Sequence, residues 1–109
     1  MSFNSVKVIS SAAVSAGATN DPVVVKLEDT LNQIIIYVVN EGDSTNLTVN
    51  VGSSPDGVNN APLQPVTLST ALRVAQIPVD IVPAFLIFKA TNHDTTNATK
   101  YSVIISQRA

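Results

Sequence analysis

Short runs rich in Val and Ile recur along this sequence of 109 residues, and they constrain its fold more than any other feature. Residues 34–39 form the most apolar run, which is almost entirely β-branched and therefore favours a strand over a buried helix. Because its alternate positions are all apolar, we expect a central strand that is covered on both faces. Leu47, Val49 and Val51 instead alternate with polar residues, which predicts a half-buried strand with one face in water.

Turn-forming residues separate these runs. The segment 54–57 contains proline, which presets φ, then aspartate, which bonds back to the backbone, and glycine, which accepts a positive φ. About eight short strands, with turns roughly every 8–12 residues, predict an all-β fold: an antiparallel β-sandwich of the jelly-roll or immunoglobulin-like kind. The expected strands are residues 6–9, 23–27, 34–39, 47–51, 64–68, 72–77, 85–90 and 101–106. Three prolines place the middle of this series at sheet edges, because proline cannot donate to a ladder: Pro62, Pro65 and Pro78.

The length of the chain suits one domain. Residues 10–20 are small and polar, which indicates a flexible stretch or an irregular edge. We therefore expect an N-terminal arm or connector over residues 1–20 and a single β-sandwich domain over residues 21–109. In the alternative that stays open, residues 6–9 form an ordinary first strand of the same sandwich. Within the sandwich we expect these apolar side chains to be buried: Ile35, Tyr37, Val49, Phe85, Ile87, Val103 and Ile105.

Ionisable side chains are scarce, which argues against an enzyme. Only 13% of the residues are charged, with one histidine and no cysteine, whereas catalysis needs ionisable groups that converge on a point. His93 lies in a polar loop, where we expect it to be solvated. A zinc site needs several Cys or His ligands, and the acidic residues lie mostly in predicted turns, where they bond to the backbone. We therefore expect no catalytic residue, metal, cofactor or small-molecule substrate.

Charge and hydropathy also limit the partners. The net charge is −2 and no basic stripe occurs, so nucleic-acid binding is not expected. No apolar run approaches the ~20 residues of a membrane helix, so membrane insertion is not expected. The N-terminus lacks the basic start and continuous apolar stretch of a secretory signal. Asn46 and Asn97 match the N-glycosylation pattern, which matters only if the chain is exported.

One arrangement of strands and turns carries a resemblance to known proteins. An apolar strand leads into Asn40-Glu41-Gly42, an alternating strand leads into Ser53-Ser54-Pro55-Asp56-Gly57, and the apolar segments 82–88 and 101–105 follow. This arrangement resembles the small, jelly-roll-like β-sandwich subunits of bacterial spore and cell-surface appendages and of phage virions. The resemblance implies a structural, multi-copy role and no catalytic residue. The chain departs from that pattern because it has no tryptophan after the turn and no cysteine to lock neighbouring subunits together.

We therefore expect a self-assembling structural subunit of an extracellular or spore-surface filament, a homo-oligomer or polymer joined by strand addition. The mean hydropathy, +0.28, is high for a small monomer and favours burial against further copies of the chain. The expected subunit interface consists of apolar residues near the N-terminus: Phe3, Val6, Val8 and Ile9. Two alternatives stay open, namely a phage virion component such as a capsid decoration or tail protein, and a small module that binds glycans or another protein.

Overall fold

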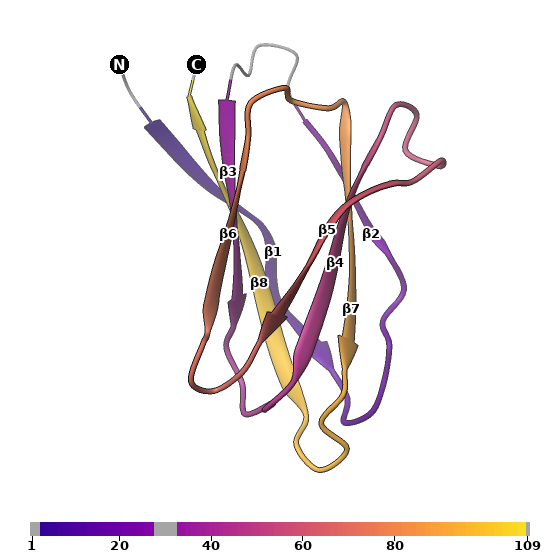
Figure 1. Cartoon of the computed structure of the whole chain (residues 1–109), viewed down its shortest axis with the longest axis vertical. Coiled ribbons are helices and arrows are strands. Elements are labelled where there is room, and N and C mark those ends of the chain that lie inside the picture. Colours follow the sequence, from indigo (N-terminus) through magenta and orange to yellow (C-terminus); the bar gives the residue numbers. More distant parts are fainter. Residues whose placement is uncertain (1–2, 28–32, 109) are drawn as a thin grey trace.

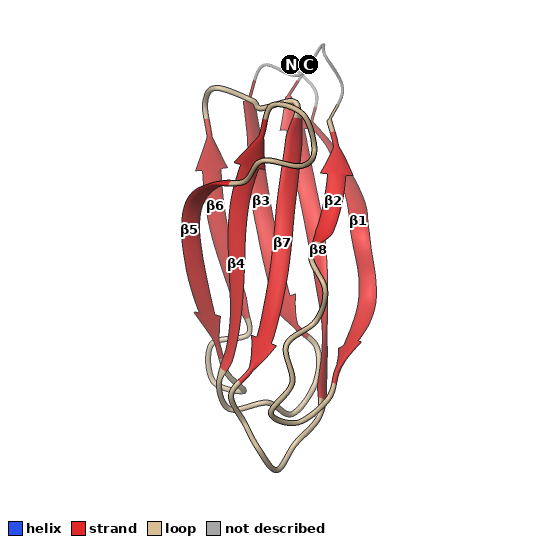
Figure 2. Cartoon of the chain, turned by 90° about the vertical axis from the view of Figure 1, so that its right-hand side faces the viewer, coloured by secondary structure: helices blue, strands red, loops and turns tan. Residues whose placement is uncertain are grey.

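The chain folds into two antiparallel sheets that pack face to face. The computed structural model describes residues 3–27 and 33–108, and within these ranges every regular element is a strand (Figure 2). Sheet A has the order β1-β8-β3-β6 and sheet B the order β2-β7-β4-β5 (Figure 1). The strand bounds are β1 Phe3–Val14, β2 Val23–Lys26, β3 Gln33–Asn40, β4 Leu47–Ser54, β5 Ala61–Leu68, β6 Val74–Val79, β7 Phe85–Asn92 and β8 Thr99–Arg108.

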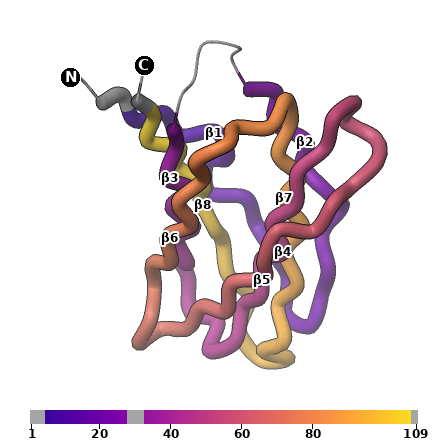
Figure 3. Tube along the Cα trace, turned by 45° about the horizontal axis from the view of Figure 1, so that its top comes forward, coloured from indigo at the N-terminus to yellow at the C-terminus, as the bar shows by residue number. Residues whose placement is uncertain are grey.

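The strand order defines a jelly roll. The first strand pairs with the last, β2 with β7, β3 with β6 and β4 with β5, all antiparallel. The chain therefore follows the path of one long hairpin whose strand pairs roll up into a sandwich. This path can be traced along the tube in Figure 3. The prediction of an all-β antiparallel sandwich of about eight strands is confirmed, and of its two forms the structure adopts the jelly roll.

Strand β3 lies at the centre of sheet A, between β8 and β6. Ile34, Ile36 and Val38 point into the core and are at most 2% exposed. The alternate residues Ile35 and Tyr37 lie on the outer face of the sheet and are only half-buried. The expectation of a strand covered on both faces is therefore wrong for the single chain, because the second sheet covers only one side of β3.

Of the side chains predicted to be buried, some face the core and others lie on the outer face of their sheet. Val49, Val103 and Ile105 are buried in the core, as expected. Ile87 is 6% exposed, but it lies on the outer face of sheet B, opposite Gly52 of β4. Phe85 is also on that outer face and is only half-buried. The expectation that Ile35, Tyr37 and Phe85 are core residues is wrong because an apolar run does not reveal which alternate set faces inward.

Strand β1 is longer than its sequence indicated. Its last five residues, 10–14, are small and were expected to be irregular, yet they continue the pairing with β8 as far as Val14 opposite Thr99. Val14 is fully buried and Ile9 is 6% exposed, so β1 contributes to the core of its own sandwich. Residues 3–14 thus take the place of an ordinary first strand, which is the alternative that the sequence left open.

Candidate assembly surfaces

Four strands form the edges of the two sheets: β1 and β6 in sheet A, and β2 and β5 in sheet B. An edge strand offers unpaired backbone groups to another chain unless proline, charge, bulges or short length prevents it. β5 contains Pro62 and Pro65, β6 contains Pro78, and these two strands contact each other across the sandwich. β2 has only four residues. The remaining edge, β1, is twelve residues long and contains no proline and a single charged residue, Lys7.

The register of β1 divides this edge into two parts. Residues 3–7 pair with residues 104–108 of β8 without interruption. Shifts then follow between Lys7 and Ile9 and between Ile9 and Ala12, and Ser11 adopts a positive φ of 48°. Because bulges turn an edge away from further pairing, the regular stretch 3–7 is the part of β1 best suited to receive another strand.

The predicted interface residues lie along this same strand. Val6 is 49% exposed, Val8 is half-buried against the core, and Ile9 is buried within it. The side chain of Phe3 lies outside the described part of the structure, although its backbone pairs with Arg108. The single chain therefore leaves Val6 and part of Val8 free for contact with another copy, while Ile9 is used by its own core. The role of these residues between subunits stays a prediction.

A carboxylate fastens the bulged part of β1 to the sheet. Glu41 Oε1 accepts a hydrogen bond of 2.6 Å from the Ser102 hydroxyl of β8 and one of 2.9 Å from the Ser11 hydroxyl of β1. The Ser102 hydroxyl also accepts a bond of 3.0 Å from the Ser11 backbone N–H. The hydrogen bond from Ser102, followed by that from Ser11, lowers the pKa of Glu41. This arrangement stabilises the one non-glycine left-handed residue among the described residues.

The loops that follow β3 and β7 lie at the lower end of the sandwich in Figure 1. Buried polar side chains in and beside these loops join the two sheets. Asn40, at the end of β3, donates to the Ser44 carbonyl at 3.0 Å and accepts from the Thr99 hydroxyl at 2.6 Å. The Ser44 hydroxyl donates to Asn92 Oδ1 of β7 at 2.6 Å, and Asn92 Nδ2 donates to the Asn97 carbonyl at 2.8 Å. Asn40, Ser44 and Asn92 are all fully buried. We call residues 40, 44, 92, 94, 97 and 99 the loop-end network.

Asp94 completes the loop-end network. Its carboxylate accepts the backbone N–H groups of Thr96 at 2.9 Å, Asn97 at 3.1 Å and Thr45 at 3.1 Å. These backbone hydrogen bonds, with that from Thr96 the largest and with the Asn97 amide adding to them, hold the pKa of Asp94 well below its usual range. Asp94 bonds to the backbone of its own turn, as predicted for the acidic residues. Its hydrogen bond to Thr45 joins positions 49 residues apart, which the sequence pattern does not reveal.

The remaining candidate residues are His93 and the two asparagines of the N-glycosylation pattern. His93 is exposed, and its backbone N–H donates to the Asn46 carbonyl at 2.8 Å. Among the described residues, no three His, Cys, Asp or Glu side chains gather as metal ligands would. Asn46 and Asn97 are exposed, and the Asn97 amide is bonded to Asp94. No helix that could span a membrane occurs in residues 3–27 and 33–108.

Comparison with known proteins supports this fold. A chain of Bacillus endospore appendages, described as a novel family of disulfide-linked pili, matches with a TM-score of 0.50 and 13% sequence identity. The match covers 97% of this chain and 86% of the appendage chain. No family model matches the sequence, and no curated protein matches it. The match supports the appendage part of the resemblance noted in the sequence and not its phage part, and at this identity it bears on the fold alone.

Proposed function

We propose that this chain is a structural, non-enzymatic subunit that assembles with copies of itself into a filament on a spore or cell surface, joined by strand addition. The observation that carries the proposal is the open edge of β1, where residues 3–7 form a regular, proline-free stretch that pairs, among the described strands, with β8 alone. The likeness in fold to a pilus-forming appendage chain supports it. The exposed His93 and the engagement of Asp94 in backbone hydrogen bonds agree with a role that requires no chemistry.

Strand addition would use the backbone for affinity and the side chains for register. A strand from a second copy would pair with the free edge of residues 3–7. Val6, which is 49% exposed beside the core residue Ile105, would bury its remaining surface in that contact. Because the sequence contains no cysteine, such an assembly would be held by hydrogen bonds and packing rather than by the disulfides that the appendage family is described as having.

The edge can be tested by one charged substitution with a matched control. Val6→Lys places a charge on the edge of β1, where charge opposes strand pairing. Val24→Lys places the same charge at a residue of nearly equal exposure, 46%, on the edge strand β2. We expect Val6→Lys to lower the assembled fraction at least tenfold, measured by light scattering and negative-stain microscopy, and Val24→Lys to leave it within about twofold of the wild type.

Both variants must keep the β-rich circular dichroism spectrum and the thermal midpoint of the wild type, because both sites are half-exposed. Assembly that survives Val6→Lys unchanged would show that the β1 edge is not the joint. Equal loss in both variants would show a general effect of charge.

A further inference from the structure

The outer face of sheet B contains a hollow of about 140 Å³. Its floor is the backbone of β4 at Val51 and Gly52, and the register places Ile87 of β7 and Pro62 of β5 on either side of Gly52. Pro22, in the segment before β2, closes another side. The volume is close to the ~150 Å³ of an engineered cavity that admits benzene, so one branched aliphatic side chain fits within it.

Two glycines, Gly52 and Gly57, allow the loop between β4 and β5 to lie beside this hollow. A Cβ atom at Gly52 would overlap the Asn60 side chain, so only glycine allows Asn60 to lie over β4. Gly57 has a φ of 81°, and a Cβ atom there would lie 3.5 Å from the Phe85 ring. The Ser54 hydroxyl also accepts a hydrogen bond of 2.9 Å from the Gly57 N–H, which holds the loop in place. The hollow is therefore bounded by the backbone of β4 and by a loop of defined position.

The polar side chains around the hollow have no partners within the described part of the chain. Lys89 and the amides of Asn50 and Gln64 line it, and none of them takes part in a hydrogen bond or ion pair with another described residue. The buried asparagines Asn40 and Asn92 of the loop-end network, in contrast, are bonded to other residues of the chain. The hollow thus combines apolar walls with one free positive charge and amides that both donate and accept.

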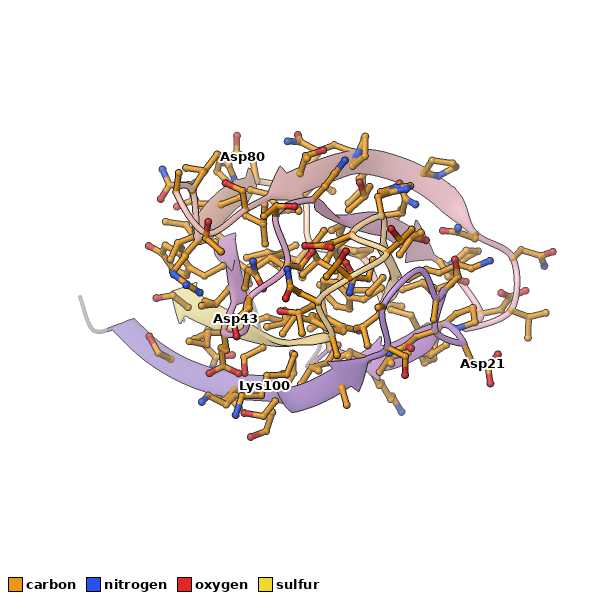
Figure 4. The ribbon with its side chains drawn as sticks, turned by 90° about the horizontal axis from the view of Figure 1, so that it is seen from below. Asp21, Asp43, Asp80 and Lys100 are labelled. Atoms are coloured by element: carbon orange, nitrogen blue, oxygen red, sulfur yellow. The ribbon has the colours of Figure 1, made fainter. Side chains whose placement is uncertain are left out.

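A complementary feature lies at the upper end of the sandwich in Figure 1, in the bend between β6 and β7. Ile81 is 90% exposed, the largest exposed fraction of any large apolar side chain among the described residues. Its neighbour Asp80 is exposed and has no partner among those residues. Neither Asp80 nor Ile81 is among the residues that line the hollow of their own chain, and Figure 4 shows Asp80 and Asp21 on different sides of the molecule.

We propose that Ile81 of one copy inserts into the sheet B hollow of the next copy, with Asp80 facing Lys89. The apolar side chain matches the walls formed by Ile87 and Pro62, and the carboxylate matches the free ammonium group beside them. The amides of Asn50 and Gln64 can bond to the backbone of the entering bend. The occupant is therefore a second copy of this chain, and the inference rests on the self-assembly proposed above.

This contact joins two different surfaces of the protein. The end of one sandwich meets the flank of the next, so the contact is heterologous and can repeat without closing into a dimer. It also differs from the β1 edge, which belongs to the other sheet. A subunit would thus have two separate connections: backbone pairing at β1, and a side-chain contact that fixes the direction in which copies add.

Cysteine cross-linking tests the contact directly, because the sequence contains no cysteine of its own. One copy would carry Ile81→Cys and a second, differently tagged copy Asn50→Cys or Gln64→Cys, co-expressed and then mildly oxidised. We expect a disulfide-linked dimer carrying both tags in at least one of the two pairs. The control replaces Ile81→Cys by Leu72→Cys, since Leu72 is also exposed, at 58%, but lies in the bend between β5 and β6. The control pair should give at least tenfold less product.

Light scattering on the same wild-type protein separates this inference from the proposed function. Assembled protein without a specific cross-link from residue 81 overturns the Ile81 contact and leaves the β1 proposal standing. Protein that is monomeric at every concentration overturns both. A charge exchange adds an independent result: Lys89→Glu should weaken assembly at least fivefold, and adding Asp80→Lys to the same chain should restore most of it. If the double variant is no better than Lys89→Glu alone, Asp80 and Lys89 do not meet.

Discussion

The loop end of this sandwich and the hollow on the outer face of sheet B use amide side chains in different ways. At the loop end, Asn40, Ser44 and Asn92 are buried and bonded to one another or to backbone, and they join β3, β7 and β8. Around the sheet B hollow, Asn50 and Gln64 are exposed and have no partner among the described residues. A polar group that is buried must be satisfied within the chain, whereas one left free on a shaped surface is available to a second molecule. The loop end therefore serves stability, whereas we propose that the hollow and the β1 edge serve association.

The largest difference in unfolding free energy between an interior and a surface substitution is expected for the two phenylalanines of β7. Phe88 is fully buried in the core, while Phe85 is half-buried on the outer face. We expect Phe88→Ala to lower the free energy of unfolding by about 3–5 kcal/mol through lost burial and the cavity left behind. Phe85→Ala should cost roughly 1 kcal/mol. Urea denaturation measures both, and equal losses would contradict the assignment of the two faces.

A smaller loss of stability is expected when an asparagine of the loop-end network is replaced, and almost none when an asparagine beside the hollow is replaced. Asn92→Ala removes the acceptor of the Ser44 hydroxyl and the donor to the Asn97 carbonyl, and it leaves buried groups unpaired. The expected loss is about 1–3 kcal/mol of unfolding free energy. Asn50→Ala should change stability by less than ~0.5 kcal/mol. A cost for Asn50→Ala as large as that for Asn92→Ala would remove the distinction between the two regions.

A smaller effect is expected from acid. The pKa of Asp94 is lower in the folded chain than in the unfolded chain, because backbone N–H groups bind the charged form. Its stabilising contribution is therefore fully present above the unfolded pKa of about 4 and is lost as pH falls toward the folded value. We expect the thermal midpoint to fall below about pH 4. Asp94→Asn should start lower at neutral pH and fall less on acidification, and an identical fall in both proteins would exclude Asp94 as a contributor.

The sequence was sufficient for those parts of the fold that depend on local pattern. The β-branched runs and the turn residues at 54–57 predicted the strands and the hairpin, and Ser54 and Asp56 do bond within that turn. The direction in which an apolar strand faces could not be predicted at Ile35 and Tyr37, because every position in the run is apolar. The pairing of residues 10–14 with β8 depends on a partner about ninety residues away, as in the Ser11 to Ser102 hydrogen bond, separated by 91 positions.

The candidate surfaces were only partly visible in the sequence. Apolar residues near the N-terminus predicted an interface, and the alternative of an ordinary first strand stayed open because the sequence does not show which partner residues 6–9 pair with. The structure places Ile9 in the core of its own chain. The sheet B hollow depends on Gly52 lying opposite Ile87, with Asn60 over it. These residues come from two strands and a loop that only the fold brings together. A lone glycine inside a strand, at Gly52, was the one local signal that could have directed attention there.

We propose above that this chain associates with itself through surfaces that the single sandwich leaves open. Light scattering of the wild-type protein over a wide range of concentrations, with negative-stain microscopy of the same samples, tests it most directly. We expect masses that are multiples of 11.4 kDa and that rise with concentration, and elongated particles in the images. A single species of 11.4 kDa at every concentration would contradict it.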